Sequence, residues 1–289
     1  MLQIDEYMEE VGEQIGRVLA LQRVRSRLGA APDSSSLIRH NANGSAHPNN
    51  LVSRPGWESA RWVSWPMDIE GIPQFEIVDD PDLYDEPVPR QISALSVPSV
   101  ELMLKIVPKG GTIFDIGSGA GQFSLAASAA GFRVLSVEPS ADRVALLRAS
   151  AGRNGFYRMR VIWAAPGSRQ QPGEAPRVSV DALAAEGSYG DVGLVRIAAD
   201  DSIQEILFGM EHLLAKPRGP SIILEGVATD ANLSAVKSWL GSLGYEIHAI
   251  TTGGRAPRSG KVGSVPDRGR VRLAARPPLG LGREWSVEP

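Results

Sequence analysis

A glycine-rich stretch, "TIFDIGSGAGQFSLA", spans residues 112–126 and is the part of the chain best suited to contact a ligand. Gly117, Gly119 and Gly121 fall at every second position, between an apolar strand-like run and a helical pattern. Glycine lets the backbone turn tightly and lets a ligand lie directly against the main chain. Backbone N–H groups at the start of the helix then face that ligand. The spacing therefore predicts a ligand-binding loop that also contains Ser118.

The glycine spacing separates this loop from two common nucleotide-binding loops. In the dinucleotide fingerprint G-x-G-x-x-G, the third glycine would fall at Gln122. A P-loop is excluded because no Gly-Lys-Ser/Thr follows. Asp115, two residues before the first glycine, gives the form D-x-G-x-G-x-G. This form resembles motif I of class I methyltransferases that use S-adenosylmethionine (SAM), with a nicotinamide dinucleotide as the alternative ligand.

An acidic residue ends the next strand-like run, "FRVLSVEPS". Glu138 follows Gly121 by seventeen residues. A carboxylate at the tip of this strand can accept hydrogen bonds from both hydroxyl groups of a ribose. A glutamate at a strand end means little alone, but together with the loop it indicates an adenosine-containing cofactor.

From about residue 80 to residue 250 the chain resembles the FkbM family of SAM-dependent methyltransferases. The similar segments are "FDIGSGAGQFSLAASAAG", "VLSVEPSADRVALLRASAGRNG" and "VSVDAL", followed less closely by "DVGLVRIAADDSIQEILFGMEHLL", "PSIILEGV" and "WLGSLGYEIHAI". The resemblance implies SAM as cofactor and methyl transfer to a hydroxyl of a sugar, glycolipid or secondary-metabolite scaffold. The cofactor-binding residues that it implies are Asp115, Gly117, Ser118, Gly119, Gly121, Glu138 and Pro139.

The chain departs from the family after the fourth strand of the fold. The family typically carries a Lys-Ile-Asp-Val-Glu-Gly run, where this chain has Arg196, Ala198 and Asp200 at the charged positions. Asp200, with Arg196 beside it, is therefore the candidate for the general base or for acceptor binding. Alternatively, Asp200 and its neighbours only cap the next helix, because Asp and Ser favour that position. The missing acid at Ala198 also leaves open a catalytically silent scaffold protein with a methyltransferase fold.

Two further residues are candidates for contact with the acceptor. Glu225 ends the fifth strand of the predicted fold. Trp65 is one of three tryptophans between residues 57 and 65, and tryptophan rings stack on sugars or line substrate openings. The alternative is that these tryptophans cover one edge of the main domain. The acidic run after them, from Asp68 to Glu86, is typical of a solvated face.

The elements that must position these residues form an alternating pattern of strands and helices from about residue 91. Such alternation predicts a Rossmann-like α/β fold with a mostly parallel, seven-stranded sheet and helices on both faces. The expected strands are 112–116, 133–138, 160–164, 192–198, 221–225, 245–250 and 270–274. The expected helices are 99–107, 122–130, 141–154, 202–214 and 232–243.

We divide the chain into an extension, a domain and a tail. The extension, residues 1–90, comprises a helix over 2–28, a loop over 30–56 and the tryptophan-rich and acidic segment 57–90. The helix has an apolar stripe that packs on its own domain or makes a partner contact, such as a homodimer. The extension is expected to form a lid, an oligomer contact or both. The methyltransferase domain follows at 91–276, and residues 277–289 form a tail.

Composition narrows the functional classes. The chain has 289 residues, a formal net charge of −3 and no cysteine. It therefore forms no disulfide or thiolate metal site, and its charge provides no broad basic surface for nucleic acid. The two histidines of the 30–56 loop have no neighbouring carboxylates at metal-ligand spacing, so no metal is expected. Without a signal-like or membrane-spanning apolar run, the chain is predicted to be cytoplasmic.

Overall fold

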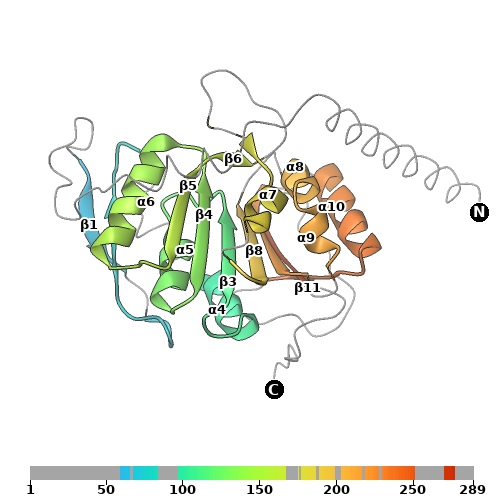
Figure 1. Ribbon diagram of the computed structural model, residues 1–289, viewed down its shortest axis with the longest axis horizontal. Coiled ribbons are helices and arrows are strands. Elements are labelled where there is room, and N and C mark those ends of the chain that lie inside the picture. The colour runs from blue at the N-terminus through green and yellow to red at the C-terminus, as the bar shows by residue number, and fades with distance from the viewer. Residues whose placement is uncertain are drawn as a thin grey trace, which may run out of the picture. The chain divides into compact units, whose positions relative to one another are not determined.

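The computed structural model describes residues 59–65, 68–83, 97–166, 175, 177–186, 189–198, 203–216, 219–227, 230–250 and 270–276. The predicted N-terminal helix, the 30–56 loop, Asp200 and the C-terminal tail lie outside these ranges. Everything below concerns the described part (Figure 1).

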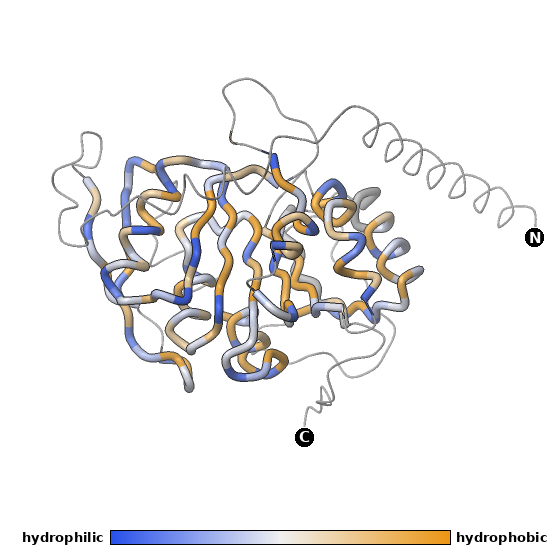
Figure 2. The backbone as a smooth tube through the Cα atoms, in the orientation of Figure 1, coloured by the Kyte–Doolittle hydropathy of each residue, from blue (hydrophilic) through white to orange (hydrophobic). Residues whose placement is uncertain are grey.

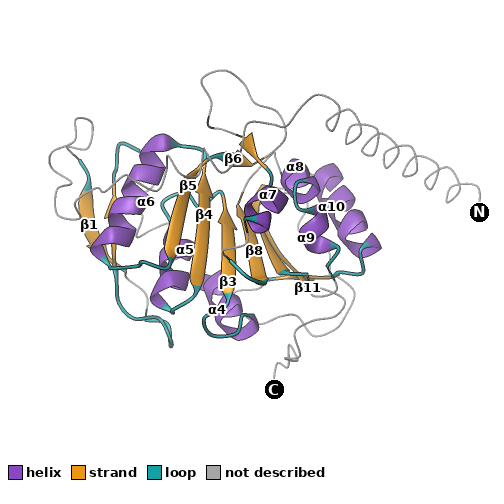
Figure 3. Ribbon diagram, in the orientation of Figure 1, coloured by secondary structure: helices purple, strands orange, loops and turns teal. Residues whose placement is uncertain are grey.

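A central sheet organises the fold (Figures 1 and 3). Its seven strands lie in the order β10-β11-β9-β8-β3-β4-β5. Their bounds are β3 Thr112–Ile116, β4 Arg133–Glu138, β5 Met159–Trp163, β8 Val192–Ala198, β9 Ser221–Val227, β10 Glu246–Ala249 and β11 Arg270–Arg276. Strands β9, β8, β3, β4 and β5 pair in parallel, whereas β11 runs antiparallel to both of its neighbours. The predicted parallel central sheet is confirmed in this block of five strands.

The apolar strands lie at the centre of the domain (Figure 2). All five residues of β3 are buried, and so are five of the six residues of β4. Strands covered on both faces read as continuous apolar runs, which is why the sequence pattern located them well. Because β3 and β8 are adjacent although they are not consecutive, the chain reverses its direction of travel across the sheet between them. Ligands of open α/β sheets bind at the carboxyl ends of the strands beside such a switch point.

In the order of the sequence, the described helices alternate with the strands of the sheet over most of the domain. Their bounds are α4 Val97–Ile106, α5 Gln122–Ala129, α6 Ala141–Arg153, α7 Val180–Ala185, α8 Ile203–Phe208, α9 Glu211–Leu214 and α10 Asp230–Ser242. Side chains of α4, α5 and α6 share one buried hydrophobic cluster with the sheet. The single helix predicted over 202–214 is wrong in the described residues, since a turn at Gly209 and Met210 separates α8 from α9. Two further short strands, β6 Ala165–Pro166 and β7 Arg177–Val178, pair in parallel.

Helix α6 begins as its sequence predicts. The side chain of Ser140 accepts a hydrogen bond from the backbone N–H of Arg143, and Asp142 lies in the first turn. Serine at this position satisfies an otherwise unpaired N–H group, and an acid there suits the positive end of the helix dipole. The start of α6 is therefore fixed directly after Glu138, the last residue of β4.

The extension contributes a two-stranded antiparallel ribbon, β1 Arg61–Ser64 and β2 Glu76–Asp79, that packs along α6 (Figure 1). The side-chain amide of Asn154 accepts a hydrogen bond from the Glu76 N–H at 2.8 Å and donates one to the Glu76 carbonyl at 2.6 Å. The Ser150 hydroxyl accepts from the Val78 N–H at 3.0 Å. One side chain of α6 and that of its C-cap residue Asn154 thus form hydrogen bonds with β2 backbone groups of the kind that a neighbouring strand would form.

Two expectations for the tryptophan-rich and acidic segment are corrected here. Trp65 is only 1% exposed and its ring stacks on Phe75 with 4.7 Å between the centroids, so it is a core residue and offers no surface to a substrate. Asp79 and Asp80 are buried rather than solvated. Asp79 accepts hydrogen bonds from the Arg61 guanidinium, which supplies the partner that a buried carboxylate requires.

Within the described ranges, no helix has the length and apolar character needed to cross a membrane.

Candidate functional site

The glycine loop connects β3 to α5 at the carboxyl edge of the sheet. Gly117, Gly119 and Gly121 have φ angles of 76°, 57° and 87°. This left-handed region is disfavoured for residues with a Cβ atom. The backbone therefore requires glycine at all three positions that the sequence analysis singled out.

The surroundings of the three glycines differ. A Cβ atom added to Gly117 would lie 2.2 Å from the carbonyl oxygen of Ala198, and one added to Gly121 would lie 2.0 Å from a methyl group of Leu147. These two glycines allow the loop to pack against β8 and α6. At Gly119, by contrast, no atom of the described residues lies within 4 Å of the Cβ position. Among the described residues, Gly119 is thus the loop glycine with space beside its backbone.

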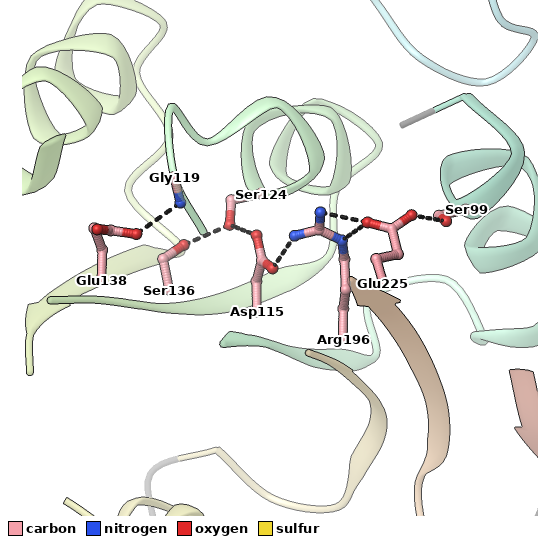
Figure 4. Close-up of polar contacts among 8 residues, drawn as sticks. All are labelled: Ser99, Asp115, Gly119, Ser124, Ser136, Glu138, Arg196 and Glu225. Atoms are coloured by element: carbon pink, nitrogen blue, oxygen red, sulfur yellow. Dashed lines mark hydrogen bonds and ion pairs between the residues drawn. The ribbon is translucent and has the colours of Figure 1, made fainter. Parts of the chain in front are cut away.

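Glu138 joins this loop to the end of β4 (Figure 4). Its Oε2 atom accepts a hydrogen bond from the Gly119 N–H at 2.8 Å, and its Oε1 atom accepts one from the Ser140 N–H at 3.0 Å. A carboxylate oxygen has two acceptor positions, and the hydrogen bonds among the described residues use one position on each oxygen. The carboxylate is therefore oriented by the protein.

Burial changes the proton affinity of Glu138. The residue is 3% exposed, and this loss of hydration raises the pKa of its carboxyl above the ordinary value of 4.5. The N–H groups of Ser140 and Gly119 and the charge of Arg143 act in the opposite direction, while Asp115 raises the pKa slightly further. The group thus titrates at a higher pH than an exposed glutamate.

Ser118 adds a buried polar group to the loop. Its side chain is 3% exposed, and its hydroxyl has no hydrogen-bond partner among the described residues. Buried hydroxyl groups in folded proteins are nearly always hydrogen-bonded. An unsatisfied hydroxyl beside Gly119 fits a loop whose remaining partner is a ligand.

A buried network of polar side chains lies beside the loop (Figure 4). Arg196 of β8 donates to Asp115 of β3 at 2.6 Å and, through Nε, to Glu225 of β9 at 2.8 Å. Ser99 of α4 donates to the other oxygen of Glu225. Burial by itself would lower the pKa of Arg196, but the two carboxylates outweigh burial and raise it. Arg196 therefore stays charged and joins three adjacent strands.

Asp115 extends this network toward the loop. The Ser124 hydroxyl of α5 donates to Asp115 at 2.5 Å, and the hydroxyl groups of Ser124 and Ser136 are 2.6 Å apart. Asp115 precedes the loop and Ser124 follows it, so their hydrogen bond fixes the two ends of the loop relative to each other. The Asp115 carboxylate is completely buried and is directed to these partners.

The structure brings together most of the predicted site residues. Asp115, the three loop glycines, Ser118, Glu138 and Pro139 lie at the ends of the adjacent strands β3 and β4. Arg196 and Glu225 contact each other, but both are buried in the network, so their expected catalytic and substrate roles stay predictions. In the described part of the chain, no group of three or more His, Asp or Glu side chains is arranged to hold a metal ion.

The sequence pattern did not single out four residues of the site. Ser99, Ser124 and Ser136 belong to the network, and Trp163 donates from its indole nitrogen to the Pro139 carbonyl at 2.8 Å. A single serine in a helix carries no recognisable signal. A large aromatic residue at the last position of β5, level with Glu138 on the neighbouring strand, is a signal that the sequence does contain.

Comparison with known proteins gives matches among solved structures only. No protein-family model and no curated protein matches the chain. A precorrin-6Y C5,15-methyltransferase from Geobacter metallireducens is 18% identical, with 62% of this chain and 87% of that chain covered and a TM-score of 0.42. A SAM-dependent methyltransferase from Agrobacterium tumefaciens is 13% identical, with coverages of 74% and 70% and a TM-score of 0.46. M. jannaschii TYW2 in complex with AdoMet is 15% identical, with coverages of 74% and 84% and a TM-score of 0.46.

At these TM-scores and identities we draw no argument about activity or ligand from the matches. The fold class rests instead on the order and direction of the strands. None of the comparisons identifies the FkbM family.

Proposed function

We propose that this protein is a SAM-dependent methyltransferase and that its acceptor is a hydroxyl of a sugar, glycolipid or secondary-metabolite scaffold. One observation carries the proposal: the Cβ position of Gly119 meets no described atom within 4 Å, and the N–H of Gly119 is hydrogen-bonded to the Glu138 carboxylate at the end of the next strand. A bare backbone beside an oriented carboxylate suits a ligand that has a ribose with two hydroxyl groups. The acceptor class rests on the resemblance to the FkbM family.

The residues of this chain fit such a cofactor. Each Glu138 oxygen retains an acceptor position for one ribose hydroxyl, and the buried hydroxyl of Ser118 retains a donor. The loop and Pro139 would line the cofactor, while Asp115 and its network hold the loop in place. When bound, SAM supplies a methyl group that is already activated as part of a sulfonium ion. The protein then has to align an acceptor oxygen with that group and exclude water.

The proton of the acceptor hydroxyl needs a base, since a hydroxyl group does not ionise appreciably at pH 7. We propose Asp200 for this role, because it follows β8 directly in the sequence and matches the second acid of the family's run. Arg196 lies two residues before the end of β8. We propose that it supports the site by holding Asp115, the residue that precedes the glycine loop.

A second candidate is a catalytically silent protein with the same fold. Arg196 and Glu225 form a buried hydrogen-bonded ion pair with each other, and Ala198 replaces the acidic residue that the FkbM family has at this position. A protein of this kind binds SAM without transferring its methyl group, or binds no cofactor.

The proposal is tested by calorimetric titration with SAM and with S-adenosylhomocysteine (SAH). We expect both to bind, and we expect Glu138→Ala to weaken binding by about 1–3 kcal/mol, the value of hydrogen bonds to a charged group. The matched control is Glu76→Ala, which removes an exposed carboxylate on β2 and should leave affinity unchanged. Absence of binding by the folded wild-type protein, or equal affinity in the Glu138 variant, would contradict the cofactor assignment. Binding without transfer to any hydroxylated acceptor would favour the silent protein.

The pH dependence of SAM binding provides an independent prediction. Because the pKa of Glu138 is raised, the carboxylate takes up a proton as the pH falls through a value above 4.5. A protonated carboxyl accepts hydrogen bonds from two hydroxyl groups less well. Affinity should thus be full above the raised pKa and should decline below it. In the Glu138→Gln variant, titrated over the same pH range, this decline should be absent; an unchanged decline would assign it to another group.

A further inference from the structure

A single peptide group links Glu138 to a residue of the neighbouring strand. The carbonyl oxygen of Pro139 accepts a hydrogen bond from the indole N–H of Trp163 at 2.8 Å. The N–H at the other end of the same peptide group, that of Ser140, donates to Glu138 Oε1 at 3.0 Å. Because a peptide group is planar and rigid, fixing the direction of its carbonyl also fixes the direction of its N–H. Trp163 thus acts on the Glu138 carboxylate through one rigid unit.

The position of Trp163 suits it to this task. It is the last residue of β5 and is the register partner of Glu138 in the parallel pair β4–β5. Its ring is partly buried and packs against the buried hydrophobic cluster, which restricts the indole, while its hydrogen bond to Pro139 lies at the surface. Ser140, at the other end of the turn, is itself fixed by the hydrogen bond from Arg143 to its hydroxyl.

We propose that Trp163 is a positioning residue of the cofactor site, which orients the Glu138 carboxylate toward the ribose hydroxyls through the Pro139–Ser140 peptide group. This inference rests on the proposed function, because it assigns the ligand of Glu138 to the ribose of SAM. Trp163 itself need not touch the cofactor.

The hydrogen bonds from Trp163 to Pro139 and from Ser140 to Glu138 form a chain. Hydrogen bonds in such a chain polarise and strengthen each other. Loss of the indole N–H should therefore weaken the Ser140 donation, which is among the interactions that stabilise the charged form of Glu138. The other groups that act on Glu138 are the Gly119 N–H, Arg143 and Asp115, and no hydrogen bond or ion pair of the described residues joins any of them to Trp163.

The test is a double-mutant cycle with Trp163→Phe, which keeps an aromatic ring but removes the N–H donor. Dissociation constants for SAM and SAH are measured by calorimetry in the wild-type and Glu138→Gln backgrounds. With Glu138 present, we expect Trp163→Phe to weaken both ligands about three- to tenfold, the effect of losing one hydrogen bond. It should also shift the midpoint of the pH dependence of binding upward. With Glu138 replaced, we expect less than about a twofold effect, since the two positions then no longer couple.

A matched control is Trp62→Phe, because Trp62 is also partly buried against the same hydrophobic cluster but lies on β1. This change should leave both affinities unaltered. Circular dichroism establishes that each variant is folded; should Trp163→Phe unfold, Trp163→Met, which has a long apolar side chain and no N–H donor, carries the same expectation.

Two outcomes would overturn the proposal. One is a Trp163→Phe protein that binds SAM and SAH like the wild type. The other is an equal loss in both backgrounds, which would mean that Trp163 acts independently of Glu138, for example by direct contact with the ligand. A wild-type protein that binds neither SAM nor SAH would contradict the proposed function instead.

Discussion

Replacement of Gly119 by Val should abolish SAM binding and leave the protein folded. The Cβ position of Gly119 meets no described atom within 4 Å, so the branched side chain would occupy the space beside the loop where the cofactor is proposed to lie. We expect the affinity to fall by at least about a hundredfold, which corresponds to roughly 2.7 kcal/mol. The φ angle of 57° adds backbone strain of about 1–2 kcal/mol, which lowers stability without unfolding a typical domain. Calorimetry with SAM measures the first effect and urea unfolding the second.

Gly131 provides a control that also has a left-handed backbone but lies at a different place. Its φ angle is 88°, and no described atom lies within 4 Å of its Cβ position. Gly131 follows α5 at the end opposite the loop. Gly131→Val should therefore reduce stability similarly and leave SAM affinity intact. Normal SAM binding by the Gly119 variant, or an equal loss in both variants, would refute the assignment of this space to the cofactor.

Replacement of Arg196 by Met should cause the largest loss of stability. The guanidinium is the only described cation that contacts both Asp115 and Glu225, and removing it deprives the buried Asp115 carboxylate of its counter-ion. Removing one partner of a buried ion pair lowers the free energy of unfolding by about 3–5 kcal/mol. That is a large part of the roughly 5–15 kcal/mol that stabilises a domain. Urea unfolding followed by circular dichroism measures the change.

The comparison for this variant is Arg153→Met. Arg153 pairs with Glu76 at 2.7 Å, but both side chains are more than a third exposed. Exposed pairs contribute about 0–1 kcal/mol, so the loss should be small. The loss of stability in Arg196→Lys should lie between the losses in Arg196→Met and Arg153→Met. An ammonium group keeps the positive charge but cannot contact two separated carboxylates as a planar guanidinium does. Equal losses for Arg196→Met and Arg153→Met would show that the network does not stabilise the fold.

The sequence was sufficient to predict the parts of the site that depend on local spacing. The loop glycines and Glu138 belong to one strand–loop–helix–strand segment, so their positions follow once the strands are located. The parallel strands were located because both of their faces are buried and their residues are mostly apolar. The reversed direction of β11 could not be read in this way, because an apolar pattern carries no information about strand direction.

Contacts between distant segments explain the remaining differences. Asp115, Arg196 and Glu225 come from three strands, and their meeting depends on a strand order that no local pattern gives. The prediction that Asp79 is solvated was wrong. It rested on the acidic residues around Asp79 in the sequence, whereas the ion pair with Arg61 on the paired strand allows Asp79 to be buried. Trp65 was open to two interpretations, and its burial in the hydrophobic cluster excludes the one in which its ring stacks on a substrate.

The way in which the β1–β2 ribbon is attached has a consequence for shortening the protein. Ile77 and Val78 belong to the same hydrophobic cluster as α6, and the polar groups of Asn154 and Ser150 are satisfied by the backbone of β2. A protein that begins at residue 91, where the alternating pattern of strands and helices starts, would expose that apolar surface to water and leave both side chains without these partners. We therefore expect a protein that begins at residue 91 to be less stable than one that retains residues from about 59 onward, although the glycine loop and Glu138 both lie after residue 91.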